Sequence, residues 1–165
     1  MHPVLRLGLL LTRVESVETR KKFQKIVHIL QVMGAPFPEK FSFHLYGPYS
    51  ADLRAELDAF IAEGLISETE KAPAFVVAPT QKLKDLLAEA AVVPPESAKW
   101  LGWAVALNKL SPQKLEGIST LLFLHQKDWP VSTWETKFKE LKGHMADKYS
   151  ELKKEADRFL QLAKA

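Results

Sequence analysis

The sequence contains no cysteine among its 165 residues. This absence excludes disulfide bonds, thiolate nucleophiles and cysteine-ligated zinc. The sequence also lacks the short motifs G-x-S-x-G, G-x-x-x-x-G-K-[ST], G-x-G-x-x-G and H-E-x-x-H, which mark common hydrolase, nucleotide and zinc sites. We therefore expect no catalytic residue, no metal and no cofactor, and we predict that the protein is not an enzyme.

Long apolar runs are absent as well. The longest ones, residues 100–107 and 118–124, are interrupted by polar residues and are far shorter than the roughly 20 residues that a membrane helix requires. The apolar run near the N-terminus, residues 7–11, lacks the flanks of a signal peptide. We expect a cytoplasmic protein that has no contact with a membrane.

The charge is nearly balanced overall but unevenly distributed. The net charge is +3. Residues 1–50 carry seven Lys or Arg against three Asp or Glu, whereas residues 51–80 carry two against six. The acidic segment is unfavourable for simple DNA binding, because contacts with phosphates supply most non-specific affinity for DNA.

Hydrophobic periodicity predicts helices over residues 3–13 and 17–33, the second opened by Ser16. Alternation over residues 41–46 predicts a short strand, and Gly47-Pro48 predicts the turn after it. Ser50 then has the position of an N-cap for a third helix that ends at Gly64.

A hairpin follows the third helix. We predict a strand starting at Leu65-Ile66, a polar connection over residues 67–73 longer than two residues, and a return strand over residues 74–78. A helix, a glycine stop and a two-stranded wing are typical of a winged helix-turn-helix. The predicted fold is therefore mainly α, with a winged helix-turn-helix domain over residues 1–92 and a helical packing or oligomerisation region over residues 93–165.

The second half of the chain is predicted to be almost entirely helical. Thr80 caps a fourth helix, Pro94-Pro95 marks the internal boundary, and helices are expected over residues 96–110 and 112–126. Residues 132–135 (STWE) have the pattern of a capping box for a helix over residues 133–163. Gly143-His144 would bend that helix or divide it in two.

Two motifs carry a resemblance to a known family. The first is Lys21-Lys-Phe-Gln-Lys-Ile-Val-His-Ile-Leu-Gln31, and the second is Tyr46-Gly-Pro-Tyr-Ser50 followed by Gly64-Leu-Ile66. Together they resemble the YwgA-like proteins of bacteria and archaea and, more distantly, the Panacea class of antitoxin-associated domains. The resemblance covers residues 3–80 and departs from the usual pattern at Phe23 and His28. It implies a winged-helix or regulator-like protein without a settled biochemistry.

The preferred functional hypothesis is a regulator that binds duplex DNA. The basic cluster of the second helix would contact the DNA backbone, and the residues around the Tyr-Gly-Pro-Tyr motif would approach the groove. The motif has a second interpretation, in which glycine and proline make a turn, the serine caps a helix and the tyrosines pack. The predicted DNA contacts are Arg20, Lys21, Lys22, Lys25, Tyr46, Tyr49, Ser50 and Arg54.

The alternative hypothesis is a protein-interaction module of antitoxin or adaptor type. The third helix carries a mostly acidic outer face, which suits a basic protein better than DNA. A second candidate interaction surface is the apolar stripe along residues 133–163, which would pack on its own domain or form a homodimer contact. The predicted partner-binding residues are Asp52, Glu56, Trp134, Phe138 and Tyr149.

The five histidines show no pair at the spacing of metal ligands. His28 and His125 fall within apolar helices, and we expect both to be buried and hydrogen-bonded in the core.

Overall fold

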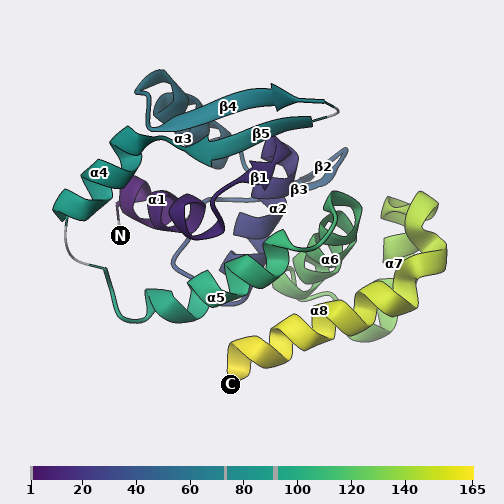
Figure 1. The fold of residues 1–165 in the computed structure, drawn as a ribbon. Coiled ribbons are helices and arrows are strands. Elements are labelled where there is room, and N and C mark those ends of the chain that lie inside the picture. The colour runs from purple at the N-terminus through teal and green to yellow at the C-terminus, as the bar shows by residue number, and fades with distance from the viewer. Residues whose placement is uncertain (1, 73, 91–92) are drawn as a thin grey trace.

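A computed structural model describes residues 2–72, 74–90 and 93–165 of the chain. Helices dominate, and two small antiparallel sheets complete the fold (Figure 1). The first half of the chain contains α1 (Pro3–Val14), β1 (Val17–Glu18), α2 (Thr19–Val32), β2 (Ser42–His44), β3 (Gly47–Tyr49), α3 (Ala51–Ala62), β4 (Ile66–Lys71), β5 (Ala74–Pro79) and α4 (Gln81–Ala90). The second half contains α5 (Ser97–Asn108), α6 (Pro112–Gln126), α7 (Trp134–Leu141) and α8 (Tyr149–Lys164), with 3-10 turns at Val131–Thr133 and Gly143–Lys148.

One hydrophobic core runs through both halves of the chain. The three-stranded sheet lies at one end of the molecule and α8 at the other, with α1, α2, α5 and α6 between them (Figure 1). Helix α2 packs against both α5 and α6, and α1 packs against α5. Residues predicted as a winged-helix domain and residues predicted as a helical region therefore share buried side chains.

The helix starts follow from local capping chemistry. The Oγ atoms of Ser50 and Ser111 accept hydrogen bonds from Leu53 N and Lys114 N, each at 3.1 Å, at the starts of α3 and α6. Gly64, just past the end of α3, has a φ of 74°, a conformation that glycine adopts without steric cost. These predicted boundaries are confirmed.

The predicted start of the second helix was wrong by two residues. Val17 and Glu18 form β1, which pairs antiparallel with Val77 and Val76 of β5, and the helix begins only at Thr19. Val17 is buried in this pairing. The strand pairs with a segment about 60 residues away, and local periodicity does not reveal such a partner.

The predicted turn at Gly47-Pro48 was also misplaced. Gly47 and Pro48 belong to β3 and pair with His44 and Phe43 of β2, while Leu45 and Tyr46 form the turn. Gly47 has a φ of 94°, so glycine serves here to start the returning strand. The hairpin of β2 and β3 thus presents Leu45 and Tyr46 at its tip.

The hairpin of β4 and β5 is longer and tighter than predicted. Residues 67–71 are paired strand rather than connection, and Lys71 pairs with Ala74, which leaves only two residues between the strands. Residue 73, part of the predicted connection, lies outside the described residues. The polar composition of β4 misled the prediction, because its outer residues Thr69 and Glu70 face solvent.

The predicted last helix is divided rather than bent. Lys142 leaves helical geometry, with a φ of −134° and a ψ of 53°, and the chain passes through a 3-10 turn into α8. The predicted capping box does not form, since α7 begins at Trp134 and Thr133 Oγ1 instead donates to the carbonyl oxygen of Pro130 (2.6 Å). The predicted apolar stripe nevertheless faces the core on both helices.

Gly117 allows α8 to approach α6 closely. A Cβ atom at this position would lie 2.5 Å from Leu152 Cδ1 and 2.9 Å from Leu152 Cδ2. Leu152 is itself buried, so its side chain has little free space to occupy. Gly102 of α5, by contrast, has no atom within 4 Å of an added Cβ.

We expect Gly117→Ala to lower the free energy of unfolding by about 1–3 kcal/mol, because the methyl group overpacks the α6–α8 contact. The matched variant Gly102→Ala should be neutral or stabilising, since alanine favours a helix. Urea unfolding of both variants measures the difference. A Gly117→Ala protein as stable as Gly102→Ala would contradict the close α6–α8 contact.

Candidate interaction site

The two sequence motifs meet in space at one buried junction. The side-chain amide of Gln24, on α2, forms two hydrogen bonds with the backbone of Ser50. Its Nε2 donates to Ser50 O and its Oε1 accepts from Ser50 N, each at 2.9 Å. Gln24 and Ser50 are both buried. The pair of bonds fixes the start of α3 against α2, because a buried polar group without a partner destabilises the fold.

The next turn of α2 holds the hairpin itself. Lys25 Nζ donates to the carbonyl oxygen of Pro48 at 2.6 Å. Lys21 Nζ lies 3.5 Å from the centroid of the Tyr46 ring, a favourable cation–π contact. Residues 21, 24 and 25 lie on one face of a helix, so the spacing within the first motif explains how it contacts the second.

The other side of the hairpin packs on α6. A Cβ atom at Gly47 would lie 3.4 Å from Thr120 Oγ1 and 3.5 Å from Glu116 Cγ. An added Cβ would thus be in ordinary van der Waals contact with α6, and the position favours glycine because of its positive φ. The Tyr-Gly-Pro-Tyr motif is a hairpin inserted between α2 and α6.

Buried cations surround this hairpin. Lys142 Nζ donates to the carbonyl oxygen of Leu45 (3.1 Å) and lies 3.4 Å from Glu116 Oε1. Lys25 and Lys142 are both almost fully buried. The pKa of Lys25 is lowered to about 8, mainly by burial, with Lys142 and Lys21 acting in the same direction and Glu116 opposing them.

Most of the predicted DNA contacts are engaged within the protein. Arg20 forms ion pairs with Asp58 (2.6 Å) and Glu68 (2.7 Å), and its hydrogen bonds to Glu68 raise its pKa. Lys22 is buried and donates to the carbonyl oxygen of Asn108 (2.8 Å). Together with the buried Lys25, these residues have little cationic surface to offer a DNA backbone.

The remaining predicted DNA contacts differ in their exposure. Lys21, Tyr46 and Arg54 are exposed, Tyr49 is half-buried against His44 with ring centroids 4.9 Å apart, and Ser50 is buried. Tyr46 belongs to the hairpin and Arg54 to the outer face of α3. Lys21 of the basic cluster and Tyr46 of the groove-facing set are in contact with each other, whereas Arg54 lies on α3.

The predicted partner-binding residues divide into accessible and buried ones. Asp52 is exposed on α3 and its carboxylate accepts a hydrogen bond from Lys40 N (3.3 Å). Trp134 and Phe138 are buried in the core, and Tyr149 is half-buried with its ring centroid 5.6 Å from that of Phe138. The stripe of the last segment is thus filled by contacts within the chain, so Trp134 and Phe138 are not exposed to a partner.

Glu56, the fifth predicted partner residue, belongs to a cluster that sequence reasoning missed. Arg6 Nη2 lies 2.8 Å from Glu39 Oε1 and 3.0 Å from Glu56 Oε2. Arg6 and Glu39 are buried and Glu56 is half-buried. The cluster joins α1, the segment before β2 and α3, and the only signal for it in the sequence is an arginine within the apolar pattern of α1.

The two carboxylates of this cluster share one arginine. Glu39 Oε2 is buried and has no hydrogen-bond partner within the described part of the chain. Burial raises the pKa of Glu56 to about 7, and the adjacent charge and hydrogen bond of Glu39 raise it as well. A proton on Glu56 would therefore give the buried Glu39 carboxylate a hydrogen-bond donor.

The prediction that two histidines are buried is confirmed for His28 and wrong for His125. His28 is buried as expected, with Nδ1 2.7 Å from Ser119 Oγ and Nε2 3.1 Å from Gln126 Oε1. Burial lowers its pKa to about 4. His125 is instead exposed, because α6 turns this position away from the core. Within the described residues, no group of three or more His, Cys, Asp or Glu side chains is placed to hold a metal ion.

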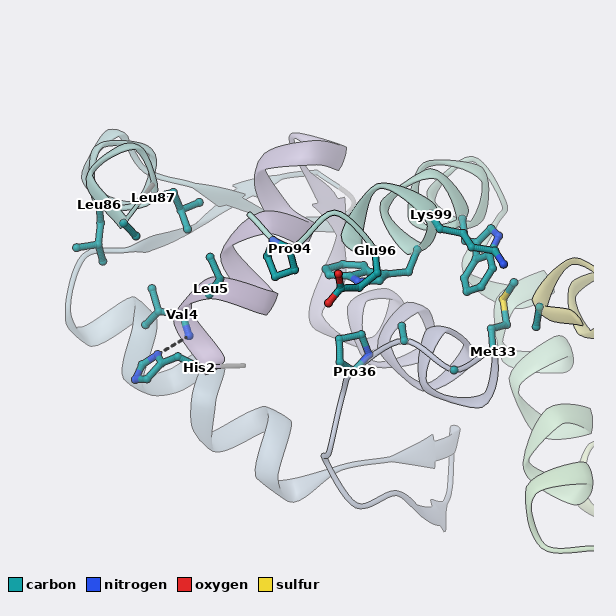
Figure 2. A pocket seen from close by; sticks show the side chains of 16 residues that line it. His2, Val4, Leu5, Met33, Pro36, Leu86, Leu87, Pro94, Glu96 and Lys99 are labelled. Atoms are coloured by element: carbon teal, nitrogen blue, oxygen red, sulfur yellow. Dashed lines mark hydrogen bonds between the residues drawn. The ribbon is translucent and has the colours of Figure 1, made fainter. Parts of the chain in front are cut away.

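A separate cavity of about 1060 Å³ lies between the start of α1, α4 and α5 (Figure 2). Its walls are mainly apolar, with Leu5, Leu87 and Trp100 among them. Lys99, which also lines it, donates to the carbonyl oxygen of Ala165 (2.5 Å). A cavity of this size and lining accommodates an apolar group, but none of the contacts in the described residues indicates which group it would bind.

Comparison with known proteins identifies a relative of this chain. No family model matches the chain. The uncharacterized protein YwgA of Bacillus subtilis (strain 168) is 31% identical over 108 residues, which are 63% of this chain and 63% of YwgA. The sequence is YwgA-like. This confirms the resemblance predicted from the two motifs, and the match spans a little under two thirds of the length of YwgA.

The comparison adds no function, since YwgA is itself described as uncharacterized. The more distant likeness to antitoxin-associated domains stays a prediction. In the described ranges of the chain, none of the helices is long and apolar enough to cross a membrane.

The Glu56 cluster predicts a pH dependence of stability. Because the pKa of Glu56 is about 7 in the folded protein against an ordinary 4.5, the folded state binds more protons than the unfolded state between these pH values. The free energy of unfolding should therefore fall as the pH rises from about 4.5 to 7. The Glu56→Gln variant should not show this fall. At pH 8 its free energy of unfolding should be higher than that of wild type by on the order of 1 kcal/mol, because the partial exposure of Glu56 reduces the effect.

Urea unfolding at several pH values between 4.5 and 8 measures the effect. The control Glu70→Gln makes the same substitution on the exposed side of β4 and should keep the wild-type pH dependence. A Glu56→Gln protein with the same pH dependence as wild type would show that the cluster does not share a proton in this way.

Proposed function

We propose that the protein is a non-enzymatic protein-interaction module built on a winged-helix scaffold. The element order α1, β1, α2, α3, β4, β5 and the sheet order β1-β5-β4 support the scaffold. In this arrangement α3 has the place of the recognition helix and the hairpin of β4 and β5 that of the wing. The hairpin of β2 and β3 is an insertion between the second and third helices of that scaffold.

The outer face of α3 is the proposed docking surface. Its exposed side chains include Asp52, Asp58 and Glu63, together with the cation Arg54. Asp58 is paired with Arg20, so Asp52 and Glu63 are the acids that have no ion pair among the described residues. Ala55 and Ala59 are also exposed on this helix and give a partner close access to its backbone. Acidic side chains flanking small residues suit a partner with a basic surface, because complementary charge steers association and fixes register.

The observation that carries the proposal is the placement of Arg20. Its guanidinium is directed to Asp58 and Glu68, on α3 and the wing, rather than to solvent where a phosphate would meet it. A helix that enters a DNA groove with carboxylates on its outer face loses affinity to repulsion.

Duplex DNA is the second candidate partner, and the order of elements is the observation that favours it. A recognition helix in the major groove is a common mode of DNA binding. The exposed Lys21 and Arg54 are the residues left for this role. This hypothesis and the protein-interaction hypothesis predict opposite results in the same pair of experiments.

Photo-crosslinking in cells of the source organism tests the docking surface. A photoreactive amino acid at position 55 or 59 should form a protein adduct, whereas the same residue at position 161, exposed on α8, should not. The charge-reversing Asp52→Lys/Glu63→Lys pair should reduce the adduct at least about fivefold, since it removes the complementary charge. The matched pair Asp85→Lys/Glu89→Lys, which reverses two exposed carboxylates on α4, should leave it unchanged.

The DNA arm uses fluorescence anisotropy with a mixed-sequence duplex. We expect no binding at physiological salt. Binding that weakens steeply with salt and is lost in Lys21→Glu/Arg54→Glu would contradict the proposal and support a DNA-binding regulator. Adducts to nucleic acid at positions 55 and 59 would contradict it as well.

A further inference from the structure

A small cavity of about 180 Å³ lies where α2, the tip of the β2–β3 hairpin and the start of α6 come together. It is far smaller than the cavities that hold drug-sized ligands and suits a single compact group. The residues that determine its chemistry are Lys21, Lys22, Lys25, Tyr46, Gln113 and Glu116.

Positive charge predominates in this cavity. Three lysines line it against one acidic residue, Glu116. The oxygens of Glu116 are also directed elsewhere, Oε1 to Lys142 Nζ at 3.4 Å and Oε2 to His144 Nε2 at 3.8 Å. The cavity therefore keeps a net positive charge after its own carboxylate is counted.

The lysines retain hydrogen-bond donors. Among the described residues, Lys25 Nζ makes one hydrogen bond, to Pro48 O, and Lys22 Nζ makes one, to Asn108 O. An ammonium group has three N–H donors, so two remain on each lysine. Both side chains are held in place by burial, which reduces the entropy lost when a ligand binds.

The start of α6 adds a further donor to the cavity. Ser111 Oγ caps Lys114 N, and Pro112 has no N–H. The N–H of Gln113 lies in the first turn, where a helix provides no internal acceptor and the helix dipole favours an anion. The 15-residue helix α6 thus directs its positive end at the same cavity as the three lysines.

We propose that this cavity binds a phosphoryl dianion, either inorganic phosphate or the terminal phosphate of a small phosphomonoester. The ammonium groups of Lys21, Lys22 and Lys25 and the N–H of Gln113 would hold its oxygens, with Tyr46 at the side of the cavity. A compact dianion can use donors that the bulky backbone of a DNA duplex cannot reach. The site is independent of the proposed docking surface on α3.

Isothermal titration calorimetry of the whole chain, with sodium phosphate and separately with glucose 6-phosphate, tests the site. Sodium chloride at matched ionic strength is the blank. The key variant is Gln113→Glu, since a carboxylate in the first turn stabilises the helix yet repels a bound anion. We expect it to weaken binding at least about tenfold, while Gln161→Glu, the same substitution on the exposed part of α8, leaves binding unchanged.

The two ligands distinguish the source of the phosphoryl group. Binding of inorganic phosphate alone indicates free phosphate, and tighter binding of the phosphomonoester indicates a small phosphorylated ligand; either result supports the site. Absence of heat from both ligands, or equal weakening by Gln113→Glu and Gln161→Glu, would overturn it. A Lys22→Gln protein, checked for folding by circular dichroism, should lose affinity in the same way as Gln113→Glu.

Discussion

The burial of α2 is the constraint on which the rest of the structure depends. Residues 22–30 of this helix are buried, including the polar side chains of Lys22, Gln24, Lys25 and His28. Each of them must find a hydrogen-bond partner, because a buried polar group left unpaired is costly. Their partners lie at the end of α5, at the start of α3, in β3 and on α6. The hydrogen bonds of these buried side chains therefore position four other elements against α2.

The same contacts shape the functional surface. Two lysines of the predicted basic cluster, Lys22 and Lys25, donate hydrogen bonds to backbone carbonyl oxygens. Arg20 of the same cluster forms ion pairs with Asp58 of α3 and Glu68 of β4. What remains accessible on α3 is mostly acidic, which favours a protein partner. The buried lysines keep unused donors, which favours a small anion between α2 and α6.

The sequence predicted those elements whose signals are local. Ser50, Gly64 and Ser111 mark helix ends by capping chemistry, and these boundaries hold to within a residue or two. The YwgA-like resemblance rests on two motifs that the structure brings into direct contact through Gln24 and Ser50.

The features that sequence reasoning missed depend on distant partners. Strand β1 exists because Val17 pairs with Val77, and the predicted strand at Leu65-Ile66 continues over residues 67–71 although its exposed residues are polar. The Arg6–Glu39–Glu56 cluster joins residues up to 50 positions apart, and no periodicity links them. Lys142 lies within the helix predicted over residues 133–163, and no local signal indicates that it is buried and donates to the carbonyl oxygen of Leu45, 97 residues away.

Native-state hydrogen exchange tests the central claim that α2 joins both halves of the chain into one cooperative unit. The account predicts that the slowest amides of α2 and α6 exchange with the same free energy of opening, equal to that of global unfolding. Exchange of α6 and α8 at a clearly lower free energy, with α2 still protected, would contradict it and would show that residues 93–165 open as a separate unit.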